Sequence, residues 1–422
     1  MESSETKNAD YGFRIKGNPV LLYKDRSLAA DESTHQMEKA LRQMSMEYYV
    51  LDRCMQCGIC SSACPNALLK KENIFTPRTF IEKTRLGLLD LNSDDLWSCT
   101  HCGSCRIACP FDIPLPDVMA QLRHLVVEKG AGYVPVSIKR SISSIASCGN
   151  PWKEGAMDRK KWLCATGLPE TDGYDERRVC VFLGCLAGYD RRARQTAEAV
   201  IRILQTVGVP FKILADEEVC CGDTVRRIGD FSTAEKVEKL NRKNIIKNNV
   251  ETMYVLSPHC FSAFKDVRRS DAMENIRTDL LIELIYRLFI GGAFHFTARI
   301  EKKVTFHDPC FLSKHLGIIN QPREILRGIP GIEILEMKHH GKRSLCCGGG
   351  GGGIWRDAVK GERLSEIRLD EAMETGAQTV VTSCPYCLYM LEDARRGDEK
   401  YQNLEIVDLF EFIGEGISHE NH

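Results

Sequence analysis

The sequence predicts a mixed α+β and α/β protein in which a mostly helical N-terminal part precedes a duplicated α/β unit. Cysteines with regular spacing are concentrated between Cys54 and Pro110, among short segments with helical start signals. From Arg178 onward, short β-rich runs alternate with helical periods, as parallel α/β sheets require. Cysteines in this second part also recur at a nearly constant offset, which indicates a duplication.

Three pairs of cysteines carry the evidence for the duplication. Their offsets are 125, 126 and 124 residues, for Cys185 and Cys310, Cys220 and Cys346, and Cys260 and Cys384. We expect strands at 179–183, 211–214, 252–256, 304–307, 332–335, 378–382 and 404–407. The cysteines follow the carboxyl ends of such strands, where open α/β sheets collect ligands. We therefore expect the cysteines of each copy to converge, and the copies to have a pseudo-twofold relation.

Composition divides the chain into six segments. They are a polar N-terminal arm (1–35), a ferredoxin-type domain (36–130), a linker rich in Gly, Pro and Ser (131–177), a first repeat (178–300), a second repeat (301–415) and a C-terminal tail (416–422). A charged stretch at 36–49 predicts a helix at the start of the ferredoxin-type domain.

Charge and cysteine content exclude several classes of protein. The chain has 422 residues and a formal net charge of −1, so no global field favours nucleic acid. Its 20 cysteines are too many for packing alone, and the polar N-terminus lacks an apolar export signal. We therefore expect reduced thiols and a cytoplasmic location. No stretch is long and apolar enough to cross a bilayer, so any membrane association is expected to run through a partner.

Two segments, beginning at Cys54 and Cys99, share the pattern C-x2-C-x2-C-x3-C-P. In this pattern the first three thiolates bind one [4Fe-4S] cubane and the fourth reaches the neighbouring cluster. The expected ligand sets are Cys54, Cys57, Cys60 and Cys109, the first cubane site, and Cys99, Cys102, Cys105 and Cys64, the second cubane site. Structural zinc is the alternative, but zinc does not need a doubled four-cysteine run with a trailing proline.

The second repeat contains five cysteines at three places in the chain. We call this set the second repeat site: Cys310, Cys346, Cys347, Cys384 and Cys387. Five thiols exceed the needs of one tetrahedral metal, and adjacent cysteines can serve two irons of an extended cluster. The glycine run that follows them lets the backbone approach a metal or substrate and offers N–H donors, so Gly348, Gly349 and Gly350 are candidate cofactor-binding residues. A nucleotide loop is disfavoured because no Lys-Ser/Thr follows.

At this point the sequence resembles a known family, the proteins with the cysteine-rich CCG domain. It looks most like the D-type subunit of heterodisulfide reductase, in which a two-cluster ferredoxin segment is fused to two CCG domains. The matching segments are FLGC, EEVCCGD and SPHC in the first repeat, and FHDPCFLSKH, LCCGGGGGG and VVTSCPYC in the second. The resemblance implies a noncubane [4Fe-4S] cluster at the second repeat site, where disulfides are cleaved reductively or related two-electron chemistry occurs.

The first repeat departs from the full pattern. Its cysteines, the first repeat site, are Cys185, Cys220, Cys221 and Cys260, and Ala263 stands where the last cysteine of the pattern is expected. Four thiols suit a cubane, a modified iron-sulfur cluster or a zinc ion, and the residues leave these alternatives open.

Three histidines lie near the cysteine motifs. We expect His307 to act as a proton donor at the second repeat site, and His259 and His339 to be hydrogen-bond donors or core residues. The remaining cysteines are expected to be ordinary thiols: Cys148, Cys164 and Cys180.

These features predict an iron-sulfur oxidoreductase subunit. Electrons would pass between a redox partner and the second repeat site through the two cubanes, with a small disulfide or thiol as the substrate. No G-x-G-x-x-G opens a βαβ unit, so another subunit is expected to supply a flavin, a membrane cytochrome or a catalytic centre. The alternative is a non-catalytic electron-transfer subunit of a larger complex, such as a flavin dehydrogenase, a quinone-linked complex or a thioester-reducing complex.

Overall fold

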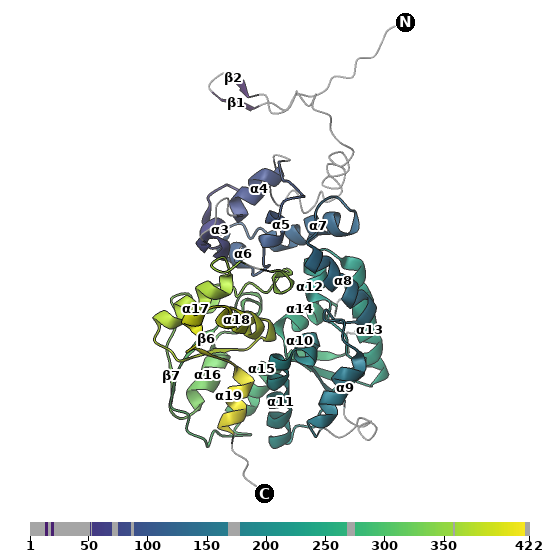
Figure 1. Ribbon diagram of the computed structural model, residues 1–422, viewed down its shortest axis with the longest axis vertical. Coiled ribbons are helices and arrows are strands. Elements are labelled where there is room, and N and C mark those ends of the chain that lie inside the picture. Colours follow the sequence, from purple (N-terminus) through teal and green to yellow (C-terminus); the bar gives the residue numbers. More distant parts are fainter. Residues whose placement is uncertain are drawn as a thin grey trace. The chain divides into compact units, whose positions relative to one another are not determined.

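The computed structural model describes residues 13–15, 18–20, 51, 53–69, 75–85, 88–167, 178–267, 275–357 and 359–417. The chain separates into two units, Met1–Tyr48 and Tyr49–His422 (Figure 1). In the first unit, β1 (Phe13–Ile15) and β2 (Asn18–Val20) pair antiparallel. The rest of the predicted arm, the predicted helix at 36–49 and residues 418–422 of the tail lie outside the described residues.

The ferredoxin-type part of the second unit is built from short helices. In chain order they are α3 (Ile59–Ser62), η1 (Pro65–Leu68), α4 (Pro77–Arg85), α5 (Asp95–Ser98), α6 (Ser104–Ala108) and α7 (Leu115–Glu128). The two cysteine motifs fold alike, because α3 follows Gly58 and α6 follows Gly103, both with positive φ. The longest helix of this part, α7, buries the side chains of Leu115, Met119 and Leu122.

The stretch from 131 to 177 contains two helices where composition predicts a linker. They are α8 (Val136–Cys148) and α9 (Ala156–Ala165). On α8, Ile138 and Ile145 share the buried face with two serines, so the low apolar content concealed an amphipathic helix. Because Ile145 packs against Cys185 and Cys220, the segment forms part of the surroundings of the first repeat site.

The first repeat contains a parallel sheet. Its strands are β3 (Val179–Phe182), β4 (Thr252–Val255) and β5 (Arg277–Leu280), in the order β3-β4-β5. The strand predicted at 211–214 is reduced to one parallel bridge between Lys212 and Cys180, and β5 was not predicted. The helices are α10 (Gly184–Tyr189), α11 (Arg191–Thr206), η3 (Ala215–Glu217), α12 (Asp223–Arg227), α13 (Phe231–Lys247), α14 (Pro258–Val267) and α15 (Leu281–Ile290).

The second repeat contains a parallel sheet of the same design. Its strands are β6 (Lys302–His307), β7 (Ile332–Ile334), β8 (Thr379–Thr382) and β9 (Glu405–Asp408), in the order β7-β6-β8-β9. The bridge at Lys212 occupies the place of β7 in the first sheet, so the strand order agrees between the repeats. The helices are η5 (Phe311–His315), α16 (Asn320–Gly328), η6 (Gly341–Arg343), η7 (Gly353–Trp355), α17 (Leu364–Glu374), α18 (Pro385–Gly397), η8 (Glu399–Tyr401) and α19 (Leu409–Gly416).

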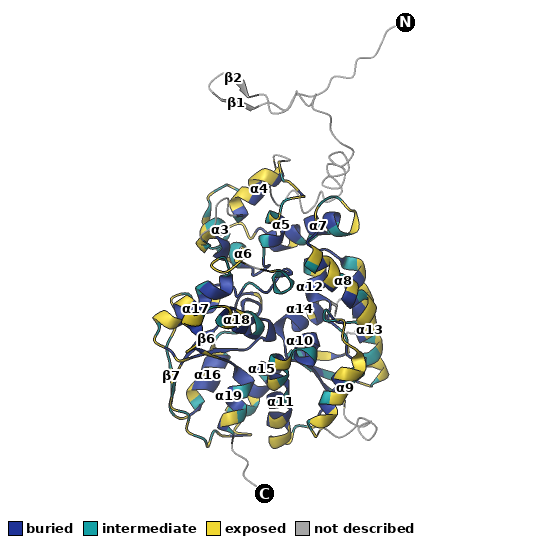
Figure 2. Cartoon of the chain, in the orientation of Figure 1, coloured by how far each residue is buried: buried dark blue, intermediate teal, exposed yellow. Residues whose placement is uncertain are grey.

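The two sheets share one hydrophobic core. Phe182 and Val255 of the first sheet belong to the same buried cluster as Phe306 and Val381 of the second. Figure 2 shows buried residues along β6 and the inner helices such as α10, and exposed residues on the outward faces of α4 and α13. The predicted mixture of a helical N-terminal part and two parallel α/β sheets is therefore confirmed.

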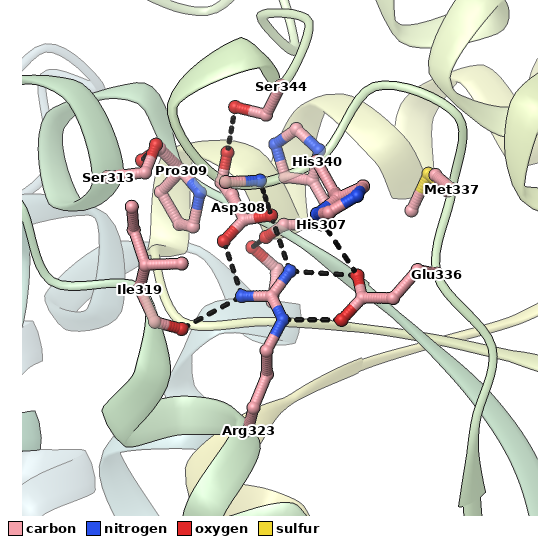
Figure 3. A network of polar contacts seen from close by, with 12 residues as sticks. His307, Asp308, Pro309, Ser313, Ile319, Arg323, Glu336, Met337, His340 and Ser344 are labelled. Atoms are coloured by element: carbon pink, nitrogen blue, oxygen red, sulfur yellow. Dashed lines mark hydrogen bonds and ion pairs between the residues drawn. The ribbon is translucent and has the colours of Figure 1, made fainter.

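A buried ion pair fixes the end of β6, where the second repeat site begins (Figure 3). The Arg323 guanidinium donates to both carboxylate oxygens of Asp308, at 2.7 and 2.8 Å, and a third donor, the backbone N–H of Gly341, lies 2.7 Å away. The backbone carbonyl of Asp308 accepts from the Ser344 hydroxyl at 3.1 Å. These bonds tie the end of β6, two residues before Cys310, to the segment that leads into Cys346.

Replacing Arg323 with Met should destabilise the protein by about 3–5 kcal/mol, because Asp308 would remain buried without its cation. Denaturant unfolding under anaerobic conditions measures the loss. Arg327→Met is the matched control, since Arg327 lies on the same helix but is exposed. Equal stabilities of the two variants would contradict the structural role assigned to the ion pair.

Candidate functional site

The cysteines of the ferredoxin-type part line two neighbouring cavities. Cys54, Cys57, Cys60 and Cys109 line one cavity, and Cys64, Cys99 and Cys102 line the other. Cys105 borders both. The fourth cysteine of each motif therefore lies with the first three of the other motif, as the spacing predicts. Thiolates are the ligands that iron-sulfur clusters use, so both cavities fit such a cluster.

Solvent reaches the two cubane sites to different extents. Cys57 of the first site is exposed, whereas Cys102 of the second is buried. Burial raises the pKa of the Cys64 and Cys105 thiols above the usual value. A bound metal reverses this effect, because a coordinated thiol gives up its proton.

All five cysteines of the second repeat site are buried and lie together. Cys310 follows β6, Cys384 precedes α18, and the Cys387 and Cys347 sulfurs are 3.3 Å apart. The backbone N–H of Gly348 donates to the Cys346 sulfur at 3.3 Å. Hydrogen bonds from Cys346 and Cys387, with a smaller contribution from the N–H of Gly349, lower the pKa of Cys347. Sulfur atoms at this site thus have the backbone donors that a cluster requires.

The second cubane site and the second repeat site contact each other. A hydrogen bond with Cys346 and burial raise the pKa of Cys102. The Cys102 and Cys310 thiols in turn lower the pKa of Cys346 by hydrogen bonding to it. Cys102, Cys310 and Cys346 also share one buried cluster with Phe311. The two sites are therefore adjacent, although their cysteines are more than 200 positions apart in the chain.

Glycines 350 and 351 make this adjacency possible. A Cβ added at Gly350 would lie 2.2 Å from the carbonyl oxygen of Thr100, and one at Gly351 would lie 2.3 Å from that of Cys99. Any larger residue would push the ferredoxin-type loop away. The sequence predicts that Gly348, Gly349 and Gly350 approach a cofactor. In the structure Gly348 and Gly349 face cysteine sulfurs, whereas Gly350 contacts the backbone of the ferredoxin-type part.

His307 lies at the end of β6, beside the second repeat site. Its Nδ1 accepts from Nε of Arg368 at 3.2 Å, and arginine can only donate, so the ring proton belongs on Nε2. Nε2 is buried without a partner among the described residues, and a ring nitrogen lies within 4.8 Å of the Cys347 and Cys387 sulfurs. Burial and the Arg368 charge lower the pKa of His307 to about 3, so the ring is neutral at neutral pH.

The first repeat site brings its four cysteines together in a buried group. Hydrogen bonds from Cys185 and Cys221 hold the pKa of Cys220 well below the usual value, and Cys221 also contacts Cys260. Gly184, with φ of 85°, is needed because its Cβ would lie 3.3 Å from the Cys260 sulfur. These four sulfur donors fit either zinc or an iron-sulfur cluster.

The sequence does not predict a buried ion pair that lies next to the first repeat site. Arg159 of α9 pairs with Glu218 at 2.5 Å, and the Glu218 carboxylate accepts from the backbone N–H groups of Leu183 and Gly184. Trp152, which lies between α8 and α9, packs against both repeat sites. No periodic pattern marks α9, so the sequence carried no signal for Arg159.

The other residues singled out by the sequence lie outside the cysteine sites. His259 bonds to Asp223 at 2.8 Å and stacks on Tyr386, and His339 bonds to Glu371. Of the three remaining cysteines, Cys148 and Cys164 are exposed and Cys180 is buried.

Comparison with known proteins agrees with this arrangement. Residues 50–113 match the model of the 4Fe-4S dicluster domain, and residues 179–265 and 304–392 each match that of the cysteine-rich domain, CCG. The two CCG matches cover all nine cysteines of the two repeat sites and every strand of the two parallel sheets except the last of each, β5 and β9.

Three curated relatives are similar over most of the chain. "EtfAB:quinone oxidoreductase" of Syntrophomonas wolfei is 29% identical over 76% of this chain and 46% of its own length. "Probable membrane-anchored ferredoxin" of Chromohalobacter salexigens is 28% identical over 81% and 56%. The chain thus spans about half the length of these two proteins.

The third relative, from Methanosarcina mazei, is similar over nearly its whole length. It is the D-type subunit of the dihydromethanophenazine:CoB–CoM heterodisulfide reductase, and it is 30% identical over 400 residues, which are 88% of this chain and 95% of that protein. Together with the dicluster and CCG matches, this similarity shows that the chain belongs to the family of CCG-domain iron-sulfur oxidoreductases that includes the D-type subunit of heterodisulfide reductase.

Proposed function

We propose that the chain carries electrons from a redox partner through the two cubane sites to the second repeat site, where a small disulfide is reduced to thiols. The packing of Cys102 against Cys310 and Cys346 in one buried cluster carries the proposal, because it joins the ferredoxin-type part to the second repeat site. The exposed Cys57 marks the end at which a partner can approach.

We assign the ligands as the sequence predicts. The first and second cubane sites would each bind a [4Fe-4S] cubane, and the second repeat site a noncubane [4Fe-4S] cluster. That cluster would supply a binding position for substrate sulfur and electrons for cleavage of the S–S bond. The first repeat site would bind a further iron-sulfur cluster or zinc, since Ala263 removes the fifth thiol.

The catalytic residues in this proposal are the five cysteines of the second repeat site and His307. Because His307 is neutral, its role is to donate an Nε2–H hydrogen bond to sulfur at the site, as the orphaned buried donor requires. Arg368 keeps the ring in this tautomer, and Glu371 balances the charge of Arg368. Gly348 and Gly349 add backbone donors to the same group of sulfurs.

A cavity of about 460 Å³ beside the second repeat site would be the place where the substrate approaches. Gly348, Leu364 and Met390 line it beside the second repeat site, and Asp94 and Arg356 line it nearer the ferredoxin-type part. Its volume suits a small molecule rather than a protein chain.

The partners are proposed to be other redox subunits, a flavoprotein, a membrane cytochrome or a catalytic subunit. The relatives named for a quinone oxidoreductase, a heterodisulfide reductase and a membrane-anchored ferredoxin support this class of partner. Among the described residues, no helix has the length and apolar character needed to cross a membrane. We propose a cytoplasmic location, with membrane association through a partner as the alternative.

Burial of all five thiols favours a second candidate function, that of a relay without a substrate of its own. In this case the second repeat site would pass electrons onward to another subunit. The incomplete first repeat site is consistent with such a change of role.

The variant Cys384→Ser should lose a thiol-sensitive EPR signal while the signals of both cubanes persist, because Cys384 belongs to the second repeat site alone. Spectra of anaerobically purified protein, recorded with and without added thiol, measure this. Cys180→Ser, a buried cysteine of β3 outside the sites, is the control and should retain every signal. A thiol-sensitive signal that survives in Cys384→Ser would overturn the assignment.

Addition of a small disulfide to the reduced chain without its partner separates the two functions. The enzyme should be reoxidised and release two thiols per disulfide, since two electrons from the protein and two protons complete the cleavage. Thiol release is measured colorimetrically and cluster oxidation by absorbance. A chain that is inert to disulfides and still transfers electrons to a protein acceptor would favour the relay.

A further inference from the structure

Arg123 is a fully buried arginine on α7 whose guanidinium has no carboxylate partner among the described residues. It donates five hydrogen bonds, all to backbone carbonyls. Nε and Nη2 of Arg123 both donate to the carbonyl of Leu96, at 2.9 and 2.6 Å. The other acceptors are the carbonyls of Cys99 at 2.8 Å, Gly351 at 3.0 Å and Arg227 at 3.2 Å. Its donors are thus satisfied, and the guanidinium lies over the Trp97 ring, 5.2 Å from the ring centroid, but no carboxylate among the described residues balances its charge.

The four carbonyls belong to three parts of the chain. Leu96 and Cys99 lie in the ferredoxin-type part, Arg227 ends α12 of the first repeat, and Gly351 lies in the glycine run of the second repeat. A Cβ on Gly351 would lie 3.0 Å from the nearest guanidinium nitrogen. Arg123 therefore sits at the junction that brings the second cubane site to the second repeat site.

An uncompensated charge in this position is costly, because buried ions normally require a counter-ion. The guanidinium keeps its charge at neutral pH, because arginine does not lose its proton in proteins. Nη2 of Arg123 donates to the backbone carbonyl of Cys99 at 2.8 Å. The charge is therefore held next to a ligand residue of the second cubane site.

We propose that Arg123 is a counter-ion of the second cubane, beside the buried Lys314 ammonium at Ser104, and that its charge helps to make this cubane easier to reduce than the first. The inference rests on the proposed assignment of the cubanes. A [4Fe-4S] cubane with four thiolates is anionic, and each electron that enters makes it more so. A fixed buried cation stabilises the reduced form more than the oxidised form, which raises the reduction potential.

The charges near the two cubane sites differ in how strongly solvent screens them, and this difference sets the direction of electron transfer. Arginines near the first site, such as Arg53, Arg78 and Arg106, are exposed, so solvent and salt screen their charges. Burial by itself would make the second cubane the harder one to reduce, because it penalises added charge. Arg123 offsets that penalty, so an electron from the partner moves from the exposed first cubane to the second, which lies against Cys346.

Arg123→Met should lower the potential of the second cubane and leave that of the first unchanged. The change expected in the equilibrium between the two cubanes is on the order of tenfold, which is 59 mV for a one-electron couple. Arg123→Lys keeps the charge and should restore most of the potential, although it loses the hydrogen bonds that a fork of donors makes. A purely structural role would not be rescued by lysine.

The measurement is an EPR-monitored redox titration of the full chain under anaerobic conditions, with iron content determined for each variant. Arg356→Met is the matched control, because Arg356 also donates to a backbone carbonyl, that of Trp97, but is neutralised by Asp94. It should shift neither potential. Cys57→Ser identifies the signal of the first cubane, since Cys57 belongs to that site alone.

If Arg123→Met fails to fold, the titration of the wild-type protein still tests the proposal, because it shows which cubane has the higher reduction potential. A second cubane with the higher potential supports the proposal, and one with the lower potential overturns it. Unchanged potentials in an iron-loaded Arg123→Met protein also overturn it. Wild-type protein that binds no iron would instead contradict the proposed function on which the inference rests.

Discussion

The close approach of two loops is the constraint on which the arrangement of sites depends. The loop that begins at Cys99 lies against the backbone of Gly350 and Gly351, at a distance that leaves no room for a side chain. This packing brings Cys102 to Cys346 and buries both thiols. Electron transfer falls with distance, so the absence of side chains at these two glycines is a functional requirement as well as a packing one.

A shared core makes that approach rigid. The two parallel sheets bury one continuous set of apolar side chains, and Asp308 and Arg323 anchor the end of β6 beneath Cys310. The cysteines therefore occupy strand ends and loops supported by rigid elements, which is how binding residues are usually held in α/β folds. Arg123 completes the junction by bonding to carbonyls of all three parts of the chain.

The sequence was most informative where spacing is dictated by chemistry. The doubled four-cysteine runs and the offsets between repeats predicted the grouping of Cys109 with Cys54 and the presence of two similar sheets, because metal ligation and parallel strands impose fixed patterns. Contacts between segments far apart in the chain could not be predicted from the sequence. The glycine run predicts access to a cofactor but not the contact of Gly350 and Gly351 with the ferredoxin-type loop, and composition predicts a linker where Arg159 and Trp152 lie. For Arg123 a signal existed: it lies four residues after Met119, on the buried face of α7.

The most direct test of the account is the magnetic interaction between the second cubane and the centre at the second repeat site. When both are paramagnetic in the reduced protein, their EPR signals should be split or broadened by spin–spin coupling, because the structure places Cys102 against Cys346. Signals that add as independent spins, with the relaxation of isolated centres, would contradict the adjacency of the two sites.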